Sequence, residues 1–303
     1  MDISIHHTER AGLLFVLAGF SLLAVGDAII KGMAHMWPPT AMAATRYILA
    51  AIVLSAVLIY REGWGALLHM PKARMQWVRG AAVALSSIAI FAAVWLMPLG
   101  EAITITFTQP MLTALLAALF LGEKLRLPAI IATIVAFAGV VVVIRPNFMV
   151  LGPAALLPLA AALGMAVLII SNRATSGVAS VLAMQVYLSV TASVVLTLAT
   201  IAGHFSGVEA LHMHWPAWHV FARCAFIACS ATLAHWCIYM GTTKAGAAAV
   251  APMTYGQLLT AVALGWIFFG DVPDGMSLLG AGMIVGAGLY LWWERRPRKS
   301  LSV

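Results

Sequence analysis

Long apolar runs alternate with short polar segments along the whole of this 303-residue chain. A helix that crosses a bilayer needs about 20 residues, because the hydrocarbon core is about 30 Å thick and a helix rises about 1.5 Å per residue. Ten runs of this kind occur, approximately at residues 11–32, 40–60, 76–97, 101–122, 127–145, 152–172, 178–202, 218–241, 246–269 and 274–293. Glycine, proline and charged residues mark the connections, and only 61–75 and 203–217 are longer loops. The pattern predicts an all-α integral membrane protein with ten transmembrane helices.

The composition agrees with a protein that lies in a bilayer. Hydrophobic residues make up 63% of the chain, charged residues make up 9%, and the mean hydropathy is +1.01, which leaves too little polar surface to cover a soluble protein of this size. The two longer loops are too short to hold a folded domain outside the membrane. The net charge of +7 does not indicate a nucleic-acid partner, because the basic residues lie mostly in the gaps between apolar runs and not on one clustered face.

Lysine and arginine residues indicate the orientation, since positively charged loops are retained in the cytoplasm. Ten spans put both termini on one side, and if that side is cytoplasmic, thirteen basic residues lie inside and four lie outside. The thirteen are Arg10, Arg61, Lys72, Arg74, Arg79, Lys124, Arg126, Arg173, Lys244, Arg295, Arg296, Arg298 and Lys299, and the four are Lys31, Arg46, Arg145 and Arg223. The first run is too long for a signal-peptide core and has no convincing cleavage site, so we expect it to remain as a helix.

The two halves of the chain resemble each other. Gln109 precedes Glu123 by 14 residues and Gln257 precedes Asp271 by 14 residues, each through an apolar run. Further matches are Val25-Gly26-Asp27-Ala28 with Leu163-Gly164-Met165-Ala166, Arg79 and Ser86 with Arg223 and Ser230 at an offset of 144, and Phe91 and Trp95 with His235 and Tyr239. We therefore predict two repeats of five spans, residues 1–147 and residues 148–303 with a basic cytoplasmic tail. Because five is odd, the second repeat is inverted, an arrangement typical of transporters that alternate access. We interpret Glu123 and Asp271 as features of loops and helix ends, not as a site.

These features resemble the drug/metabolite transporter superfamily, and in particular its EamA branch. The resemblance rests on the ten spans in two halves, on Gly122-Glu123-Lys124 after Pro110, and on Lys31 late in span one and Arg46 early in span two. It covers residues 10–293, and it implies a multi-pass transporter of the bacterial inner membrane that needs no cofactor. Within this branch the chain resembles most the YddG type of aromatic amino acid exporter. The resemblance implies export of small amphipathic metabolites, with amino acids as the first expectation.

Polar and aromatic side chains within the spans are the candidates for the walls of a central cavity, because such groups are costly to expose to lipid. They suit an amphipathic or aromatic solute better than a sugar or an inorganic ion. The candidates are Ser86, Phe91, Trp95, Thr106, Gln109, His235, Trp236, Tyr239, Tyr255 and Gln257. Thr106 and Gln109 stand just before a helix break expected at Pro110. A structural role competes at each position, since tryptophans often anchor spans at the interface and hydroxyls often bond to their own helix.

Charged residues inside the spans are the sharper signal. Asp27 and Lys31 are four residues apart and share a helix face, and Arg46 lies about as deep from the external side as Asp27 does. Because a charge at membrane depth is costly unless it is paired or wetted, we expect Asp27 to contact Lys31 or Arg46. This cluster either binds a zwitterion's carboxylate or gates the external side, or it locks spans one and two together. Glu101 begins span four and is a further member of the network or, as we expect, a rim carboxylate in water.

Other chemistry is not indicated. The three cysteines all lie in the run 218–241, at spacings of five and eight residues that favour packing over a disulfide or a metal site. His204, His212 and His214 form a loose cluster in a long loop, which favours a solvated loop over a metal site. No phosphate-binding loop or HExxH motif occurs, so neither ATP-driven transport nor an intramembrane enzyme is expected. An importer of the same fold and a flippase for lipid-linked molecules stay open, and the partners we expect are a small-molecule substrate and the bilayer, with a monomer or a weak homo-oligomer.

Overall fold

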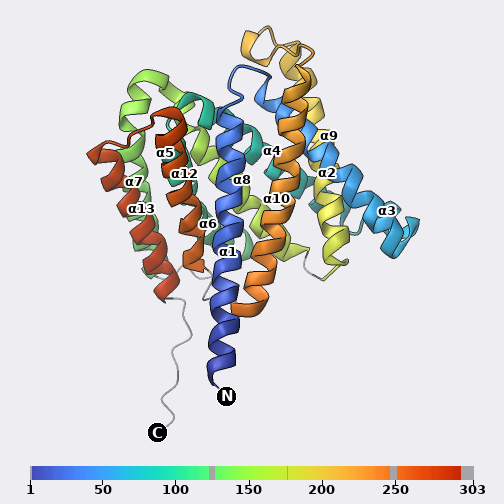
Figure 1. Cartoon of the computed structure of the whole chain (residues 1–303), viewed down its shortest axis with the longest axis horizontal. Helices are drawn as coiled ribbons and strands as arrows, with labels where there is room; N and C mark the ends of the chain where they lie inside the picture. The colour runs from blue at the N-terminus through green and yellow to red at the C-terminus, as the bar shows by residue number, and fades with distance from the viewer. Residues whose placement is uncertain (1, 123–126, 176, 246–250, 295–303) are drawn as a thin grey trace.

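Every regular element in the described part of the chain is a helix. The computed structural model describes residues 2–122, 127–175, 177–245 and 251–294. Its α-helices are α1 (Asp2–Lys31), α2 (Pro39–Glu62), α3 (Trp64–Leu68), α4 (Ala73–Leu96), α5 (Leu99–Thr106), α6 (Gln109–Leu121), α7 (Leu127–Leu151), α8 (Leu157–Ala174), α9 (Val181–His204), α10 (Trp218–Ala245), α12 (Tyr255–Phe269) and α13 (Gly275–Glu294). Short 3-10 helices are η1 (Gly152–Leu156), η2 (Glu209–Leu211) and η3 (Ala251–Thr254). Figure 1 shows the long helices side by side in one bundle.

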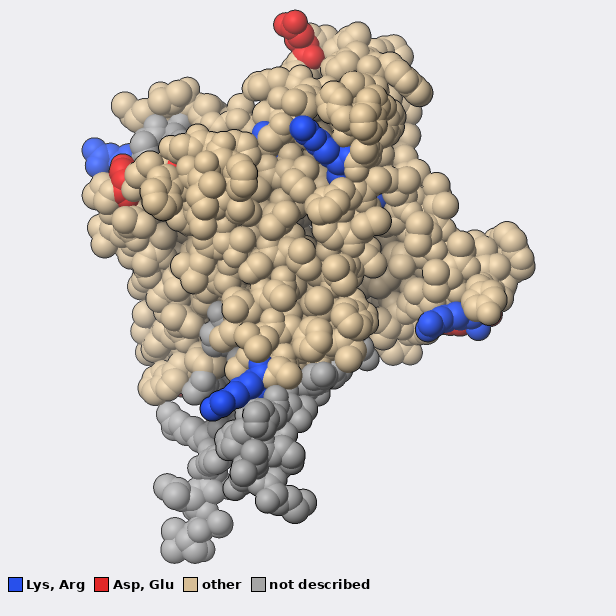
Figure 2. All heavy atoms as spheres, viewed as in Figure 1, with Lys and Arg blue, Asp and Glu red and all other residues tan. Residues whose placement is uncertain are grey.

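The long helices have the length and composition of membrane spans. In the described ranges, nine helical segments are long and apolar enough to cross a membrane, and Tyr255–Phe269 is a shorter apolar helix. The face of the molecule in Figure 2 carries its charged side chains near the top, the bottom and the protruding right edge, and the broad middle is uncharged. An uncharged belt of helices suits the hydrocarbon core, where each helix satisfies its own backbone hydrogen bonds. The chain is therefore a multi-pass membrane protein.

Contacts between loops sort the helix ends into two groups. At one end, which we call the Lys31 end, Lys31 Nζ donates to the carbonyl oxygen of Met97 after α4 at 3.0 Å. At the opposite end, which we call the Lys72 end, Lys72 Nζ before α4 donates to the carbonyl oxygen of Ala174 at the end of α8 at 2.7 Å. The start of α1 and the end of α13 both lie at the lower end of Figure 1, away from the Lys31 end. Both described termini therefore belong to the Lys72 end.

Neighbouring helices approach closely where a glycine removes the side chain. α1 packs along α10, α4 along α8, α2 along α9 and α7 along α13. A Cβ at Gly164 of α8 would lie 2.6 Å from the carbonyl oxygen of Ala82 in α4, and a Cβ at Gly139 of α7 would lie 2.8 Å from the carbonyl oxygen of Gly280 in α13. Close backbone contact of this kind allows membrane helices to associate by packing, because lipid provides little hydrophobic force between them.

The predicted span at 101–122 is broken into two helices. α5 ends at Thr106 and α6 begins at Gln109, close to the break expected at Pro110. Proline lacks the N–H that would continue the helix, and its ring crowds the carbonyl four residues earlier, which belongs to Thr106. The break follows from the proline, although the structure places it slightly before that residue.

Two other predicted boundaries differ from the observed ones. The connection predicted at Arg145-Pro146-Asn147 was wrong, because α7 continues to Leu151 and ends before Gly152, whose φ of 58° is left-handed. The loop predicted at 61–75 contains the short helix α3. The start of the predicted ninth span, 246–250, lies outside the described residues.

The sequence analysis included Arg79 among the basic residues of the cytoplasmic side. In the structure Arg79 is buried at the Lys72 end, with 3% of its surface exposed. Its Nε donates to Asn172 Oδ1 of α8 at 2.7 Å, and its Nη1 donates to the Met184 carbonyl oxygen of α9 at 3.2 Å. The same Nη1 donates to Gln76 Oε1 on its own helix. Neutral acceptors thus hold this cation, and it ties α4 to α8 and α9.

Candidate functional site

The break between α5 and α6 lies against the start of α12. Phe107, the first residue after α5, and Tyr255, the first residue of α12, have ring centroids 5.2 Å apart and planes inclined by 30°. The Tyr255 hydroxyl donates to the Val285 carbonyl oxygen of α13 at 3.2 Å. The Thr106 hydroxyl donates to the Ile103 carbonyl oxygen at 2.6 Å, so this candidate bonds to its own helix. The break between α5 and α6 and the start of α12 therefore meet through a pair of aromatic rings.

Asp27 of α1 contacts Gln257 in the first turn of α12. Gln257 Nε2 donates to Asp27 Oδ2 at 3.1 Å. The expected pairing of Asp27 with Lys31 was wrong, because Lys31 binds a different carboxylate at the Lys31 end. The expectation for Arg46 was closer, since Arg46 is near enough for its charge to act on Asp27. Asp27 and Lys31 share a helix face, but each contacts a residue from the other half of the chain. Gln257 of α12 binds Asp27, and Asp271 binds Lys31.

Arg46 of α2 lies beside two aromatic rings. Its guanidinium carbon is 4.9 Å from the ring centroid of Tyr47 and 5.6 Å from that of Phe91 in α4. Arg46 Nη2 also donates to the Tyr47 hydroxyl at 3.3 Å. The charge of Arg46 acts on His235 of α10 as well as on Asp27. Five helices thus contribute to one set of side chains, which we call the Asp27 group: Asp27, Arg46, Phe91, His235 and Gln257.

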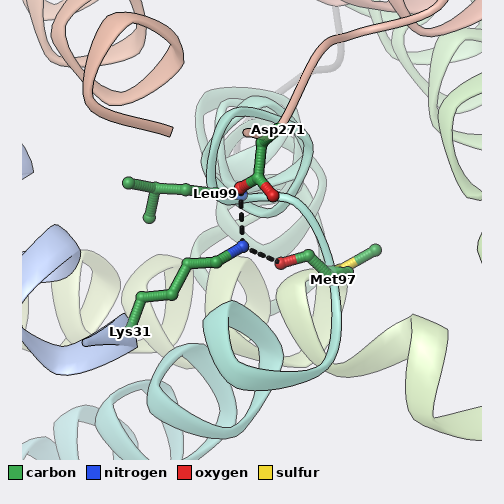
Figure 3. Close-up of polar contacts among 4 residues, drawn as sticks. All are labelled: Lys31, Met97, Leu99 and Asp271. Carbon is green, nitrogen blue, oxygen red and sulfur yellow. Dashed lines mark hydrogen bonds and ion pairs between the residues drawn. The ribbon is translucent and has the colours of Figure 1, made fainter. Parts of the chain in front are cut away.

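A second charged site lies at the Lys31 end, and Figure 3 shows its geometry. Lys31 Nζ is 2.6 Å from Asp271 Oδ2, and the two side chains are 13% and 17% exposed. The Leu99 N–H donates to the same carboxylate oxygen at 2.8 Å, and Lys31 Nζ also donates to the Met97 carbonyl oxygen at 3.0 Å. Asp271 lies just after the end of α12, as expected of a helix-end residue, and its carboxylate also has a partner that the sequence did not predict. The ion pair joins α1, the connection from α4 to α5, and the segment that follows α12.

The expectation that Glu101 is a rim carboxylate in water was wrong. It is buried in α5, and the hydroxyl of Ser277 in α13 donates to Glu101 Oε1 at 2.6 Å. α13 begins at Gly275 and packs against α5, which covers the carboxylate. The position of a helix from the end of the chain decides the environment of Glu101, and the local sequence pattern does not contain that information.

Two further candidates join helices to one another. Ser86 of α4 is buried, and its backbone N lies 2.9 Å from the place that a Cβ would take at Gly164 of α8. Trp95 of α4 donates from Nε1 to the Ile30 carbonyl oxygen of α1 at 2.9 Å. Both contacts join α4 to a neighbouring helix, so the structural role that competed at these positions is present.

The remaining candidates lie elsewhere or outside the described part. Gln109 donates from Nε2 to Thr113 Oγ1 at 3.3 Å, one turn further along its own helix. Trp236 of α10 is half exposed and packs edge-on against Phe15 of α1, with ring centroids 6.1 Å apart. Phe15 is twelve residues, about 18 Å of helix, from Asp27. The side chain of Tyr239 lies outside the described residues.

Sequence reasoning missed two residues that the structure brings into these sites. Phe107 precedes Tyr255 by 148 positions, the same offset that separates Gln109 from Gln257, so the repeat contained a usable signal. Ser277 has no comparable signal, because its contact depends on how α13 packs. Within the described ranges, no group of three or more histidine, cysteine, aspartate or glutamate residues is placed to hold a metal ion.

Comparisons with known proteins relate the chain to transporters. Residues 10–145 match the EamA-like transporter family. A riboflavin transporter of Rhizobium johnstonii is 29% identical over 95% of this chain and 93% of its own length, and a riboflavin transporter of Vibrio cholerae is 26% identical over 99% of this chain and 100% of its own length. An S-adenosylmethionine uptake transporter of Rickettsia bellii is 23% identical over 68% of each chain. A solved crystal structure covers 93% of this chain with a TM-score of 0.57 and 19% identity, which shows a similar fold. Similarity to transporters along nearly the whole chain indicates a transporter and not an enzyme, and within it residues 10–145 match the EamA-like transporter family.

Proposed function

We propose that this protein is a secondary transporter of the bacterial inner membrane that moves a flat aromatic metabolite of the riboflavin class by alternating access. The observation that carries the proposal is the meeting of aromatic and polar groups where the break between α5 and α6 lies against the start of α12. Phe107 stacks on Tyr255, and two residues further along α12 Gln257 binds Asp27. Interrupted helices with converging polar groups are where transporters with inverted repeats bind their substrates. Two relatives that match along nearly all of both chains are named riboflavin transporters.

Two inverted repeats, residues 1–147 and 148–303, account for a set of paired features. Gly122 and Gly270 are 148 positions apart, and they end α6 and α12 with φ 66° and ψ 19° against φ 68° and ψ 17°. Phe107 and Tyr255 are separated by the same offset and stack on each other. A residue that contacts its own counterpart is expected only near the axis that relates two halves. These features support an axis between the two rings.

The two halves are not in the same local conformation. Gly26 and Gly164 are predicted counterparts, and so are Ser86 and Ser230. A Cβ at Gly164 would lie 3.1 Å from Ser86 Cβ, whereas a Cβ at Gly26 would lie 4.0 Å from Ser230 Oγ. At this level α4 and α8 are packed more tightly than α1 and α10, which come equally close at Gly19, where a Cβ would lie 2.7 Å from the Ala234 carbonyl oxygen. Alternating access predicts such a difference, because the tight and loose arrangements exchange between the halves when the site changes side.

Ten crossings fit the position of the termini. Because both described termini lie at the Lys72 end (Figure 1), the chain crosses an even number of times, so η3 with α12 counts as a tenth crossing beside the nine longer segments. The excess of lysine and arginine at the Lys72 end assigns that end to the cytoplasm. The Lys31 end then faces outside, and the Lys31–Asp271 pair, with one residue from each repeat, serves as the external gate.

Export of aromatic amino acids stays a second candidate. The stacked rings suit any flat aromatic solute, and Arg46 offers a cation for the carboxylate of a zwitterion. The direction of transport is equally open to test, since resemblance favours export and one relative is named an uptake transporter. The assay below therefore includes amino acids and measures flux both ways.

Counterflow in proteoliposomes tests the proposal. Vesicles with purified protein, loaded with unlabelled solute and free of ATP, receive labelled riboflavin, S-adenosylmethionine, phenylalanine or tryptophan in turn. We expect riboflavin to exchange. In Tyr255→Leu the apparent affinity should fall about 2- to 12-fold, because the lost stacking contact is worth about 0.5–1.5 kcal/mol. Phe226→Leu, which changes a lipid-exposed ring of α10, should leave it unchanged.

Three outcomes contradict the proposal. Flux that appears only with ATP hydrolysis contradicts secondary transport. Exchange of amino acids without exchange of riboflavin contradicts the substrate class and favours the second candidate. Equal losses in Tyr255→Leu and Phe226→Leu contradict the placement of the substrate beside Tyr255.

A further inference from the structure

We propose that Asp27, Gln257 and Arg46 form a hydrogen-bonding edge that recognises a cyclic imide, the CO–NH–CO unit at one end of the flavin ring system. This inference rests on the proposed function and names the part of the substrate that the site binds. An imide edge presents an acceptor, a donor and a second acceptor in a row. Its complement is one acceptor with donors on both sides, and these three side chains contain that set.

Asp27 supplies the acceptor. An ionised carboxylate only accepts hydrogen bonds, and it has two oxygens to do so. Oδ2 accepts from Gln257 Nε2 at 3.1 Å, and Oδ1 accepts from none of the residues that the structure describes. A carboxylate oxygen without a donor at membrane depth is costly until water or a ligand supplies one. The N–H of a neutral imide meets that need without bringing a further charge into the membrane.

Gln257 and Arg46 supply the donors. The amide nitrogen of Gln257 carries two hydrogens, and its contact with Asp27 uses one. The guanidinium of Arg46 has five N–H donors, and within the described ranges one hydrogen bond, to the Tyr47 hydroxyl at 3.3 Å, uses one of them. Gln257 contacts the Asp27 carboxylate directly, and Arg46 is close enough for its charge to act on that carboxylate. Each donor is thus available to one carbonyl oxygen of the imide.

Aromatic rings lie beside the Arg46 donors. Tyr47 and Phe91 are buried, with ring centroids 4.9 and 5.6 Å from the Arg46 guanidinium carbon, and they hold this cation in place. An amino acid pairs its ammonium with Asp27 and its carboxylate with Arg46, but it has no N–H flanked by two acceptors, so the second donor of Gln257 stays unused. The full set of groups therefore selects an imide over a zwitterion.

Competition in the same full-length proteoliposomes tests the inference. Labelled riboflavin competes with unlabelled riboflavin, with riboflavin methylated on the imide nitrogen, and with a flavin altered on the opposite, benzenoid ring. We expect the imide-methylated compound to compete roughly 5- to 100-fold more weakly than riboflavin, because it leaves the Asp27 acceptor without a donor. The benzenoid variant should compete within about threefold of riboflavin.

Variants assign the preference to Asp27. Asp27→Ala should lose the discrimination between riboflavin and its imide-methylated form, and Asp27→Asn, which keeps a carbonyl acceptor, should retain part of it. Lys72→Met, at the Lys72 end, should retain all of it. Riboflavin exchange with equal competition by the imide-methylated compound in the wild-type protein overturns this inference and leaves the proposed function standing. Absence of riboflavin exchange in the wild-type protein overturns both, and the wild-type result does not depend on whether any variant folds.

Discussion

Removal of one partner of the Lys31–Asp271 ion pair is expected to destabilise the protein far more than removal of both. The two charged atoms are 2.6 Å apart, and the side chains are 13% and 17% exposed. At an effective dielectric constant of about 20 their attraction is roughly 6 kcal/mol, but desolvation costs several kcal/mol for each ion. The pair therefore contributes little net stability, whereas one buried charge left alone costs about 3–5 kcal/mol.

The hydrogen bonds around the pair make the two single changes unequal. Asp271→Leu should cost most, because it leaves the Lys31 ammonium unpaired and also removes the acceptor of the Leu99 N–H, which lies 2.8 Å from the carboxylate. Lys31→Met should cost less, because Asp271 keeps that hydrogen bond. The double variant should lie within about 1–2 kcal/mol of the wild type, so the coupling energy between the two changes should reach about 2 kcal/mol or more.

Equilibrium unfolding in mixed micelles, followed by tryptophan fluorescence, measures the free energy of unfolding of each variant. Lys72→Met is the matched control, because exposed Lys72 donates to the Ala174 carbonyl oxygen at 2.7 Å and such a contact contributes less than about 1 kcal/mol. If the double variant is as unstable as the sum of the two single variants, the reasoning is refuted, because the two charges then do not interact.

Two further predictions concern a close contact and a helix cap. Gly164→Ala should lower the free energy of unfolding by about 1–3 kcal/mol, since the new Cβ would lie 2.6 Å from the Ala82 carbonyl oxygen. Gly286→Ala, where nothing lies within 4 Å of the new Cβ, should be neutral or slightly stabilising in the same measurement. Asp274 accepts a hydrogen bond from the Ser277 N–H at 2.6 Å, and hydrogen bonds from Ser277 lower the pKa of Asp274. The stabilisation of the start of α13 by ionised Asp274 is thus complete above the ordinary aspartate pKa of about 3.9, and it is lost as the pH falls through the lowered pKa. Hydrogen-exchange protection at the start of α13 should therefore fall over this pH range in the wild type. It should change little in Asp274→Asn.

The helices and the break between α5 and α6 were predictable because they depend on local chemistry. Apolar length decides whether a segment spans a membrane, and the missing N–H of Pro110 decides where the helix cannot continue. The connection predicted at Pro146 failed because a membrane helix tolerates a proline when its freed backbone groups find other partners. The same residue type thus gave a correct boundary at one position and a wrong one at another.

The partners of the charged residues were not predictable from spacing. Asp27 and Gln257 are 230 positions apart, and their contact depends on the depth and rotation of α12 beside α1. Glu101 is covered by Ser277, 176 positions later. The repeat was the one long-range signal available, and its 148-position offset pairs Phe107 with Tyr255. Contacts between residues at equivalent positions of the two repeats were therefore predictable from the sequence. Contacts that depend on helix packing alone were not.

Lys31 and Asp271 are separated by 240 positions in the chain. At about 5 to 20 residues per second, a ribosome needs roughly 12 to 48 s to add that length, and during this time the lysine lacks Asp271 as its partner. A lysine at the end of a span can lift its ammonium to the membrane surface in the meantime, because its long apolar stem reaches water. The place of Lys31 at the last residue of α1 therefore lets the first span enter the membrane long before Asp271 is synthesised, and it makes this ion pair one of the last contacts to form in a new chain.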